Sequence, residues 1–565
     1  MLLLAAAALG AAAAHNPPPG WRRVGAARPG ETHEVMFGVR QRQEGLRAIE
    51  ARLLAAEPPP HLTLDGVGAL VRDEAAQAGL RQWLAAAGAS VTAATPAGEF
   101  VRATASVEVW EQQLGGQFLE FEAPAPAAGR ALRCPDCSLP AALEPHVSAL
   151  FNSQTLPPVP PPPRPHAAAP TPPAGPFIDP AKLFRVYNLS QSETRGDPTL
   201  GQGVVGLGIT FDPHSVELFQ QRFLPAADLP RVSVVMGGNG SYPGPAGAGG
   251  EADLDLEYLM AVSQGTPTSF FFIPGSGGPS VEDPMLAFLE LAASLAAPPE
   301  VLSISYGEAE LVIDPQVVDA LNTEAMKLGA RGVTIVTASG DDGVLIPPAR
   351  QHQSWHGVGP CAYVPGWPDT SPFITVVGAT QGHELPSPRP DQIIACQSSK
   401  GGGITTGGGF SAKVPRPTWQ DDAVEGYLNS EQGRASAKGF VSTGRAYPDI
   451  SMAGHSFVIV AGNESSVGSG TSVSAPVFAG FVSLINARRK ERGMQSVGFI
   501  NPTLYRAGRA AFRDIVDGEN NCAAGHNMSS LVCCEEGFRA AVGWDPLTGV
   551  GEPLSWHALA SLFAL

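Results

Sequence analysis

The chain has 565 residues, of which 44% are hydrophobic and 16% are charged, so it is long and apolar enough to bury the cores of two or more domains. Its formal net charge is -17, and no long run of lysine and arginine supplies a basic surface. Because phosphate groups are bound by basic surfaces, this composition argues against a nucleic-acid partner.

The first residues, MLLLAAAALGAAAA, form an apolar run that ends in an Ala-x-Ala pattern. This predicts a secretory signal peptide over residues 1–14, although the usual basic start is missing. The run is too short to span a bilayer, and no other stretch approaches the ~20 uninterrupted apolar residues of a transmembrane helix, so we expect no membrane insertion. Four Asn-x-Ser sequons fit passage through the secretory pathway and attachment of N-glycans, at Asn188, Asn239, Asn463 and Asn527.

Residues 15–155 mix helical patterns, over 41–54, 80–88 and 106–116, with short strand-like segments. We expect a compact α+β domain there. The following stretch, 156–176, has the sequence LPPVPPPPRPHAAAPTPPAGP. So much proline favours an extended, solvated polyproline conformation, which predicts a domain boundary and a linker that proteases can reach.

Residues 177–565 alternate apolar, β-branched runs with helical stretches. This pattern predicts an α/β fold in which helices cover both faces of a parallel sheet. Sites in such folds gather at the carboxyl ends of the strands. The strands are expected over 203–210, 269–273, 301–307, 332–341, 373–380 and 456–462, and the helices over 251–262, 284–296, 314–328 and 475–490.

Seven cysteines also fit the secretory pathway. Cys134 and Cys137 form a CPDC pair, and Cys522, Cys533 and Cys534 cluster near the C-terminus. A thioredoxin-like motif needs a strand before CPDC and a helix after it, and the flanking residues indicate neither, so a local crosslink or free thiols are favoured. The odd number leaves at least one thiol unpaired in a monomer, and the connectivity stays open.

The stretch GSGTSVSAP, residues 468–476, ends a strand-like run and opens a long apolar helix. A serine at such a turn, among small residues, can present its hydroxyl to a substrate carbonyl while nearby N–H groups face the developing oxyanion. An ordinary helix N-cap is the simpler explanation of a lone serine before a helix. The intact Gly-Thr-Ser-x-Ser-x-Pro sequence favours a nucleophile, Ser472.

A serine nucleophile needs a base, and a subtilisin-like histidine is the first candidate. None of the twelve histidines stands in the histidine-glycine-threonine context that accompanies that base. His214 follows the first expected strand, and His352 and His356 lie in a loop-like stretch after Asp341. We interpret them as ordinary surface or loop histidines.

Carboxyl groups offer another base in GEADLDLEYLMAV, residues 250–262. Glu251 and Asp255 are four positions apart, so on a helix their carboxyls share one face, and Asp253 and Glu257 form a second such pair. A solvated acidic face is the simpler explanation of this spacing. Where such a pair is buried beside a site, however, one carboxyl keeps its proton next to the other, and the pair can relay a proton.

Together, GSGTSVSAP, the paired acids of GEADLDLEY and the ASGDDG segment resemble the sedolisins, the serine-carboxyl peptidases of family S53 with a subtilisin-like fold. The similarity extends most closely to the lysosomal tripeptidyl peptidases among them. It runs through PPPGWRRVG, LRQWLAAAGA, YNLS, ISYG, GGGFSAKVPRPTWQ, GRAYPDIS, SLIN, GFINPTLY and GWDPLTGVGEP. Any one motif is weak, but their order and joint presence are specific.

The resemblance assigns Ser472 as the nucleophile and Glu251 as the general base, with Asp255 orienting Glu251 and holding its proton. Asp341, protonated, would donate a hydrogen bond to the oxyanion. A carboxylate is a weak base at neutral pH and a carboxyl donor must keep its proton, so these assignments imply an acidic pH optimum.

Three neighbouring acids are set aside. The family spacing selects the first pair of the helix over Asp253 and Glu257, although the sequence alone does not exclude the second pair. Asp342 adjoins Asp341, and two neighbours on a turn cannot face one cavity. We therefore expect Asp342 to be a surface or supporting residue.

The C-terminal segments FRDIVDGENN and VGWDPLTGVGEP resemble the calcium site of the same family. The resemblance implies a calcium ion bound by the side chains of Asp514 and Asp545 and by the backbone carbonyls of Ile515, Ala541 and Gly543, a set of hard oxygen ligands. Ala541 stands where the similar tripeptidyl peptidases have glycine, and a carbonyl ligand needs no particular side chain. A pair of aspartates in ordinary turns is the alternative.

The N-terminal domain, 15–155, resembles the family's propeptide, which assists folding and silences the enzyme until acid triggers self-cleavage. The cut is expected in the linker, and a disulfide within the segment from Cys522 to Cys534 is implied as well. GGGFS, residues 407–411, is expected to line the substrate cleft, where glycines let an extended peptide pair with the backbone. A flexible loop is the alternative there.

The resemblance thus implies a self-processing zymogen that removes tripeptides from the free N-termini of peptides or unfolded proteins, in the lysosome or, alternatively, after secretion. A sedolisin-type endopeptidase is the first alternative, because the loops that close the cleft cannot be positioned from sequence. A glycoside hydrolase would also use paired carboxylates but would not require GTSxS. A non-catalytic peptide-binding protein would usually lack one of the four site residues, and all four are present.

Overall fold

The computed structural model describes residues 21–57, 59–123, 129–157, 176–225, 229–237, 242–245, 250–274, 283–345, 359, 361–436, 438–524 and 530–565. The expected signal peptide and almost all of the expected linker lie outside these residues. So do two sequons, Asn239 and Asn527, and two histidines, His352 and His356.

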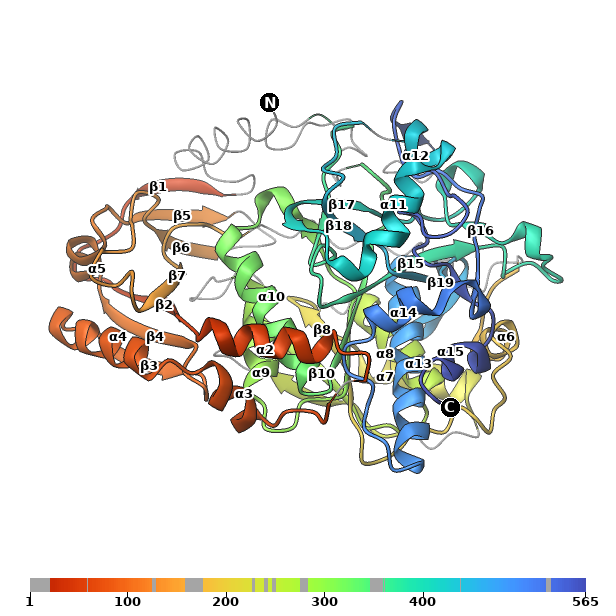
Figure 1. Cartoon of the computed structure of the whole chain (residues 1–565), viewed down its shortest axis with the longest axis horizontal. Coiled ribbons are helices and arrows are strands. Elements are labelled where there is room, and N and C mark those ends of the chain that lie inside the picture. The colour runs from red at the N-terminus through yellow and green to blue at the C-terminus, as the bar shows by residue number, and fades with distance from the viewer. Residues whose placement is uncertain are drawn as a thin grey trace. The chain divides into compact units, whose positions relative to one another are not determined.

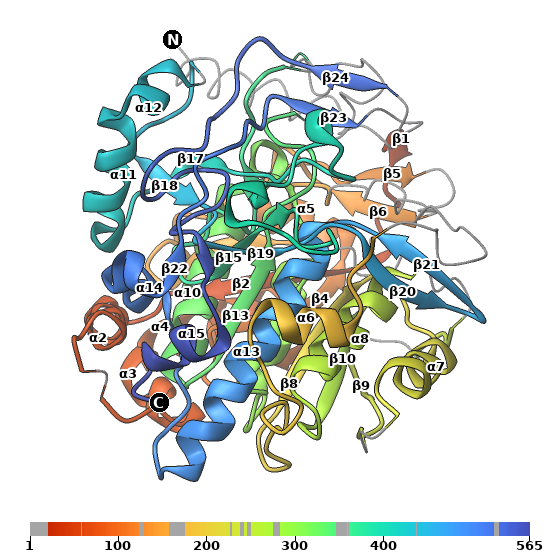
Figure 2. The ribbon, with the colours of Figure 1, turned by 90° about the vertical axis from the view of Figure 1, so that its right-hand side faces the viewer.

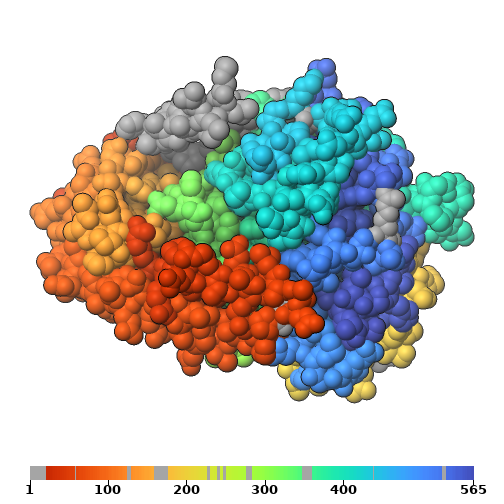
Figure 3. All heavy atoms as spheres, in the orientation of Figure 1, coloured from red at the N-terminus to blue at the C-terminus, as the bar shows by residue number. Residues whose placement is uncertain are grey.

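The chain divides into two compact units (Figure 1). The N-terminal unit comprises Met1–Pro160, Ile273–Ala296 and Ile313–Arg331. The C-terminal unit comprises Pro161–Phe272, Ala297–Val312 and Gly332–Leu565. The N-terminal residues, coloured red and orange, form one continuous part of the surface in Figure 3.

Two antiparallel sheets organise the N-terminal unit, with strand orders β3-β4-β2-β7 and β1-β5-β6. Helices pack on them around a core that includes Phe37, Leu80 and Trp110. The three expected helices of this region are present, which confirms the α+β prediction. The elements are β1 Arg22–Ala26, β2 Thr32–Val39, α2 Gln43–Leu53, α3 Leu64–Val71, α4 Glu74–Ala87, β3 Ser90–Ala94, β4 Phe100–Ser106, α5 Val107–Leu114, β5 Leu119–Ala123, β6 Gly129–Arg133, β7 Val147–Phe151, α9 Pro284–Ser294 and α10 Pro315–Ala330.

These helices begin and end where their sequences supply caps. The side chains of Thr63, Asp73 and Ser106 each accept a hydrogen bond from a backbone N–H in the first turn of the helix that follows. Gly88 and Gly115 end α4 and α5 with φ values of 74° and 75°, in the left-handed region that glycine adopts without strain. The boundaries of these helices are therefore local properties of the sequence.

Helix α10 carries a buried ionic cluster of the N-terminal unit. Lys327 Nζ lies 2.7 Å from Glu99 Oε1 and 2.6 Å from Glu324 Oε1, and all three side chains are buried. Burial raises the pKa of Glu324 to about 7, against the opposing effect of the Lys327 charge. For Glu99, burial is outweighed by the charge and hydrogen bond of Lys327, and the pKa is lowered. One ammonium group thus neutralises only one of two buried carboxylates.

A mostly parallel, eight-stranded sheet forms the centre of the C-terminal unit. Its order is β16-β15-β13-β11-β8-β10-β9, with β19 paired to β15. The pairs β9/β10, β8/β11, β11/β13, β13/β15 and β15/β19 are parallel, and β15/β16 is antiparallel. The expected strands from 203–210 to 373–380 all lie in this sheet, which confirms the α/β prediction.

The expected strand over 456–462 does not join that sheet. It forms β20, which pairs antiparallel with β21 in a two-stranded ribbon. The ring of Phe457 packs against Tyr258 at a centroid distance of 5.0 Å, and the Tyr258 hydroxyl donates to the Val458 carbonyl at 2.8 Å. The apolar side chains that suggested a sheet strand are therefore buried against helix α8.

The elements of the C-terminal unit are α6 Pro180–Val186, β8 Gln202–Leu207, α7 Pro213–Phe223, β9 Ser233–Met236, α8 Glu251–Val262, β10 Thr268–Ile273, β11 Val301–Ile304, β12 Glu308–Ala309, β13 Thr334–Ala338, β14 Gly366–Trp367, β15 Thr375–Gln381, β16 Ile394–Ala395, β17 Gly409–Pro415, α11 Asp421–Asn429, α12 Glu431–Ala435, β18 Gly444–Tyr447, β19 Ile450–Ala453, β20 Phe457–Ala461, β21 Glu464–Gly468, α13 Thr471–Glu491, α14 Asn501–Ala507, β22 Phe512–Arg513, β23 Cys522–Ala524, β24 Leu531–Cys533, β25 Glu552–Pro553 and α15 Trp556–Ser561.

Helices α8 and α13 pack against each other in the core of this unit (Figure 2). A β-carbon at Gly480 of α13 would lie 2.7 Å from the β-carbon of Val262 in α8, so glycine permits an approach that any other residue would block. Although α13 is long and mostly buried, no helix in the described part of the chain has both the length and the apolar character needed to cross a membrane.

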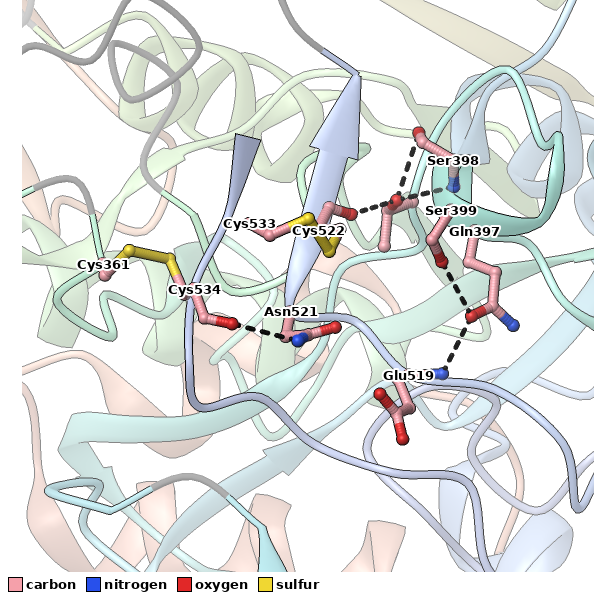
Figure 4. Close-up of a disulfide and its surroundings, with 10 residues drawn as sticks. Cys361, Gln397, Ser398, Ser399, Glu519, Asn521, Cys522, Cys533 and Cys534 are labelled. Carbon is pink, nitrogen blue, oxygen red and sulfur yellow. Dashed lines mark hydrogen bonds between the residues drawn. A yellow bond between two sulfur atoms is a disulfide. The ribbon is translucent and has the colours of Figure 1, made fainter. Parts of the chain in front are cut away.

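Three disulfides pair six of the cysteines and leave the buried Cys396 as a free thiol. Cys134 bonds to Cys137, so CPDC forms a local crosslink, and Cys522 bonds to Cys533, as the resemblance implied. The remaining pair, Cys361–Cys534, spans 173 positions of the sequence. Figure 4 shows the two C-terminal disulfides side by side.

Candidate active site

Ser472 is the second residue of α13 and follows strand β21 after a two-residue turn, as the sequence predicts. Its side chain is partly exposed, whereas Ser474 is fully buried and donates to the carbonyls at the end of β19, at distances of 3.3 and 3.2 Å. A β-carbon at Gly454 would lie 2.6 Å from Ser474 Oγ, so the turn is tightly packed on that side. Of the two serines, Ser472 is thus the accessible one.

The first carboxyl pair of α8 is linked to this turn through Ser305, at the end of β11. Ser305 Oγ lies 2.8 Å from Asp255 Oδ1 and 3.2 Å from the Ser472 carbonyl oxygen. Asp255 is buried, and burial, with the charge of Glu251 as the next cause, raises its pKa well above the ordinary range. Asp255 therefore keeps its proton under conditions in which an exposed carboxyl would be ionised.

Glu251 occupies the first position of α8, behind Gly250 with a φ of 84°. It is partly exposed, so the pair has one accessible and one buried member. The Ser472 hydroxyl makes no hydrogen bond with any residue that the structure describes. Catalytic hydrogen bonds often tighten only when substrate is bound.

Asp341 follows strand β13, at the carboxyl end of the sheet. Its Oδ1 accepts hydrogen bonds from the backbone N–H of Thr471 at 2.8 Å and from the Thr471 hydroxyl at 2.9 Å. Its Oδ2 lies 3.5 Å from the position that a β-carbon on Gly470 would occupy. The carboxyl group is therefore held beside the peptide that leads into Ser472.

The other acids have structural partners. Asp253 and Glu257 are buried and so form no solvated face, because α8 is surrounded by the core. Asp253 Oδ1 accepts from the Asp212 backbone N–H at 2.7 Å, and Glu257 accepts from that of Val460 at 3.2 Å. Burial raises the pKa of Glu257 well above its ordinary value. Asp342 is partly exposed and makes a backbone bridge to Thr405.

The glycines of GGGFS approach the Asp341 loop closely. Gly407 N–H donates to the Gly340 carbonyl at 2.8 Å, and a β-carbon at Gly407 would lie 2.0 Å from the Ser339 oxygen. A β-carbon at Gly408 would lie 1.8 Å from the Pro546 oxygen. The segment is therefore packed backbone and not a loose loop.

The residues expected to bind calcium also come together. The Asp545 carboxyl is buried and accepts from the Ala541 N–H at 3.1 Å, and the Asp514 carboxyl accepts from the Gly543 N–H at 3.1 Å. Burial raises the pKa of Asp545 to about 7, and among the described residues it makes no ion pair. The described residues contain no group of three or more metal-binding side chains. The Asp514 carboxyl nevertheless reaches the turn at 541–545 that carries Asp545, and two carboxylates with neighbouring backbone carbonyls suit a hard cation.

The chain matches two described families, the pro-kumamolisin activation domain over residues 19–154 and the subtilase family over residues 279–502. Tripeptidyl-peptidase 1 of Bos taurus is 30% identical over 557 residues, which cover 95% of this chain and 92% of the relative. The human (Homo sapiens) protein matches with the same identity and coverage. This chain belongs to the tripeptidyl-peptidase 1 family.

A solved structure agrees with membership of the tripeptidyl-peptidase 1 family at the level of the fold. The chain matches Pseudomonas sedolisin, a serine-carboxyl proteinase solved with two molecules of pseudo-iodotyrostatin, with a TM-score of 0.52 and 22% identity. The match covers 69% of this chain and 99% of that one. The predicted subtilisin-like fold, the serine-type peptidase and the zymogen with an activation domain are thereby confirmed.

Sequence reasoning did not single out Ser305. It lies in ISYG, which was noted only as a short stretch similar to the sedolisins. A serine at the carboxyl end of a predicted parallel strand was the available signal, because that end of the sheet is where sites gather. Its partners on α8 and α13 are distant in sequence and become visible only in the folded chain.

Proposed function

We propose that this peptidase removes tripeptides from the free N-termini of peptides, with Ser472 as nucleophile, Glu251 as base, Asp255 as its proton-holding partner and Asp341 as oxyanion donor. The observation that supports the assignment most directly is the convergence of two carboxyls on one turn. Asp255 is linked to the Ser472 peptide through Ser305, and Asp341 is bonded to the neighbouring Thr471.

In the first half of the reaction, Ser472 Oγ forms a bond to the substrate carbonyl carbon while Glu251 takes the hydroxyl proton. The carbonyl electron pair moves to oxygen, and protonated Asp341 donates a hydrogen bond to this oxyanion. Glu251 then passes the proton to the leaving amine as the C–N bond breaks, which leaves an acyl-enzyme. Water then forms a bond to the acyl carbon and gives a proton to Glu251. The bond from that carbon to Ser472 Oγ breaks as Glu251 returns the proton to Oγ, and the N-terminal fragment leaves with a new carboxyl group.

This mechanism needs an acidic medium because Asp255 and Asp341 act only in their protonated forms. The raised pKa of Asp255 keeps one proton on the buried member of the pair, and Asp341 donates to the oxyanion only while protonated. As pH rises, Asp255 loses this proton and the rate should fall. Activity should therefore be greatest under acidic conditions.

The test compares two peptide reporters at about pH 4, near ordinary carboxyl pKa values. One is an Ala-Ala-Phe reporter with a free N-terminus, and the other carries a blocked N-terminus. Cleavage of the free form alone, abolished by Ser472→Ala, is the expected result. Cleavage of both forms would identify a sedolisin-type endopeptidase. Cleavage of neither form, after the activation domain has been lost, would favour the alternative of a non-catalytic peptide-binding protein.

The proposed layout of the precursor is a signal peptide over 1–14, an activation domain over 15–155, a linker over 156–176 and a peptidase domain over 177–565. The relatives' names and the activation-domain match support the zymogen, and the proline-rich linker supports a cut between the domains. Lysosomal residence is proposed by analogy with this family, with secretion as the alternative. Peptides and unfolded proteins are the proposed substrates.

N-glycans are proposed at the two sequons that the structure describes. The side chains of Asn188 and Asn463 are exposed, which a glycan requires. Asn463 Oδ1 lies 2.8 Å from His214 Nε2. This contact uses the amide oxygen of Asn463 and not the amide nitrogen, to which a glycan is attached. His214 is thus an exposed residue of α7, as expected of an ordinary histidine.

Calcium is proposed as a structural cation of the C-terminal unit. The carboxylates of Asp514 and Asp545 and the carbonyls of Ile515, Ala541 and Gly543 would hold it, and their oxygen chemistry suits the ion. When bound, the ion would neutralise a buried carboxylate and join the segment around residue 514 to the turn at 541–545. Its contribution would be to stability, because none of these residues belongs to the proposed proton relay.

A further inference from the structure

The backbone of the Asp341 loop is held from both sides by one residue, Thr405. Thr405 N–H donates to the Asp341 carbonyl oxygen at 3.0 Å. Two residues further on, Gly343 N–H donates to the Thr405 carbonyl oxygen, also at 3.0 Å. The conformation of the loop at Asp341 therefore depends on where Thr405 lies.

The position of Thr405 depends in turn on its hydroxyl group. The side chain is fully buried, and Thr405 Oγ1 donates to the Cys522 carbonyl oxygen at 2.5 Å. The same oxygen accepts from the Ser398 backbone N–H at 2.9 Å. The same hydroxyl also lies 3.2 Å from Ser398 Oγ. The bond to Cys522 is buried, whereas Ser398 is partly exposed, so loss of the hydroxyl would leave the buried Cys522 carbonyl oxygen without this donor.

Cys522 lies on a small hairpin of β23 and β24 that is covalently braced (Figure 4). The Cys522–Cys533 disulfide joins directly opposed residues of the two strands, and the adjacent Cys534 is bonded to Cys361. Asn521 Nδ2 donates to the Cys534 carbonyl at 3.0 Å, and Cys534 N–H returns a bond to the Asn521 carbonyl at 2.8 Å. The hairpin is therefore a rigid support for whatever is bonded to it.

The same C-terminal segment meets the loop at a second point. Val344 N–H donates to the Asn520 carbonyl oxygen at 3.0 Å. A β-carbon at Gly343 would lie 2.1 Å from that oxygen, and Gly343 has a φ of 60°, so glycine is needed for the loop to approach so closely. Thr405 and Asn520 thus tie residues 341–344 to one braced structure.

We propose that Thr405, anchored on the disulfide-braced hairpin, is a positioning residue that sets the place of the Asp341 carboxyl for oxyanion stabilisation. The inference rests on the proposed function of Asp341. An oxyanion donor must lie about 2.7–3.1 Å from the developing charge, and displacement by about 1 Å can cost a hundredfold in rate. A residue that fixes the loop to a rigid support therefore acts on the chemical step more than on substrate binding.

The test is Thr405→Val, which keeps the shape of the side chain and removes the hydroxyl. We expect kcat on the N-terminal tripeptide reporter to fall about 10- to 100-fold with KM changed less than about threefold, because the substrate still binds while the donor is displaced. Thr405→Ser, which restores the hydroxyl, should return kcat to within about threefold of the parent. All rates are corrected for the folded fraction by near-UV circular dichroism.

Thr334→Val is the matched control. Thr334 is also buried, and its hydroxyl also donates to a backbone carbonyl at 2.5 Å, but it lies at the opposite end of β13 from Asp341. It should leave kcat within about threefold of the parent after correction for folding. An equal loss of kcat in Thr334→Val, an unchanged kcat in Thr405→Val, or no rescue by serine would overturn the proposal.

Asp341→Ala separates this inference from the function on which it rests. Loss of an oxyanion donor should lower kcat by about 100-fold or more. If Asp341→Ala kept full activity, the assignment of Asp341 itself would be wrong, whatever Thr405→Val did. If Asp341→Ala lost activity while Thr405→Val kept it, the role of Asp341 would stand and the positioning role of Thr405 would be refuted.

Discussion

Replacement of Lys327 by methionine should destabilise the precursor strongly at neutral pH and much less at acidic pH. Lys327 lies 2.7 Å from Glu99 and 2.6 Å from Glu324, and its side chain is 2% exposed. Methionine fills a similar volume but removes the one positive charge of the cluster. Two buried carboxylates would then face each other without an ion-pairing cation, although the charge of Arg331 would still act on both.

The magnitude follows from the burial of this cluster. Removing one partner of a buried ion pair costs roughly 3–5 kcal/mol. The pKa of Glu324 is already about 7 with Lys327 present, against an ordinary value of 4.5, so ionising this carboxyl costs the folded state on the order of 3 kcal/mol. Without Lys327 the lowered pKa of Glu99 should rise as well.

The pH dependence has a definite sign. A carboxyl whose pKa is raised in the folded state contributes stability below its unfolded pKa and loses that contribution as pH rises through the folded value. We therefore expect Lys327→Met to cost roughly 3–5 kcal/mol at about pH 7.5, but only about 1 kcal/mol near pH 4, because the variant, which lacks the cation that lowers the pKa of Glu99, can protonate both carboxyls there.

Urea unfolding of the whole chain, carrying Ser472→Ala to prevent self-cleavage, measures this difference. Lys438→Met is the control, because Lys438 pairs with Glu536 at 3.1 Å but its side chain is 86% exposed. That exposed pair should contribute little to stability at either pH, because solvent screens it. An equal loss for Lys327→Met at both pH values would refute the reasoning, because it would mean that lost packing and not unpaired charge is responsible.

Three further predictions concern the C-terminal unit. Ser305→Ala removes a hydrogen bond that lowers the pKa of Asp255, so the alkaline limb of the kcat/KM against pH profile should move to higher pH, and kcat should fall about tenfold. An alkaline limb at the same pH as in the parent would argue against a role for this contact. Chelation of calcium should lower the thermal unfolding midpoint of the enzyme, and added calcium should restore it. If the ion was present at a hundredfold excess over its Kd, the lost stability should be about 2–3 kcal/mol. A midpoint that responds to neither treatment would contradict the proposed calcium site. Replacement of both Cys522 and Cys533 by serine should lower the free energy of unfolding in urea by about 3 kcal/mol, the value expected for a disulfide with a sequence separation of 11. A loss near zero would show that hydrogen bonds alone hold the hairpin.

Much of the site was predictable because its signals are local. The four-residue spacing of Glu251 and Asp255 fixes a shared helix face wherever the helix lies. The small residues around Ser472 indicate a strand-to-helix turn, and the structure has that turn. These patterns depend on neighbours within a few positions, and tertiary packing did not alter them.

Other features depend on contacts between distant segments. The spacing of Asp253 and Glu257 fits an exposed acidic face, but both are buried because helix α8 is enclosed on nearly all sides. The pairing of Cys361 with Cys534 has no local signal, since seven cysteines allow many connectivities. The apolar run over 456–462 has strand character, yet periodicity does not say which partner it pairs with.

The close contact between Gly480 and Val262 has a mechanical consequence. Ser472 and Glu251, the two residues proposed to exchange a proton, lie in the first turns of helices α13 and α8. The contact between Gly480 and Val262 holds the same two helices together at positions closer to their C-terminal ends. Gly480 lies eight residues beyond Ser472, roughly 12 Å along the helix axis, so a side chain inserted there would act as a wedge far from the reacting atoms. The spacing of the two helices that carry Ser472 and Glu251 therefore depends on the absence of a β-carbon at Gly480.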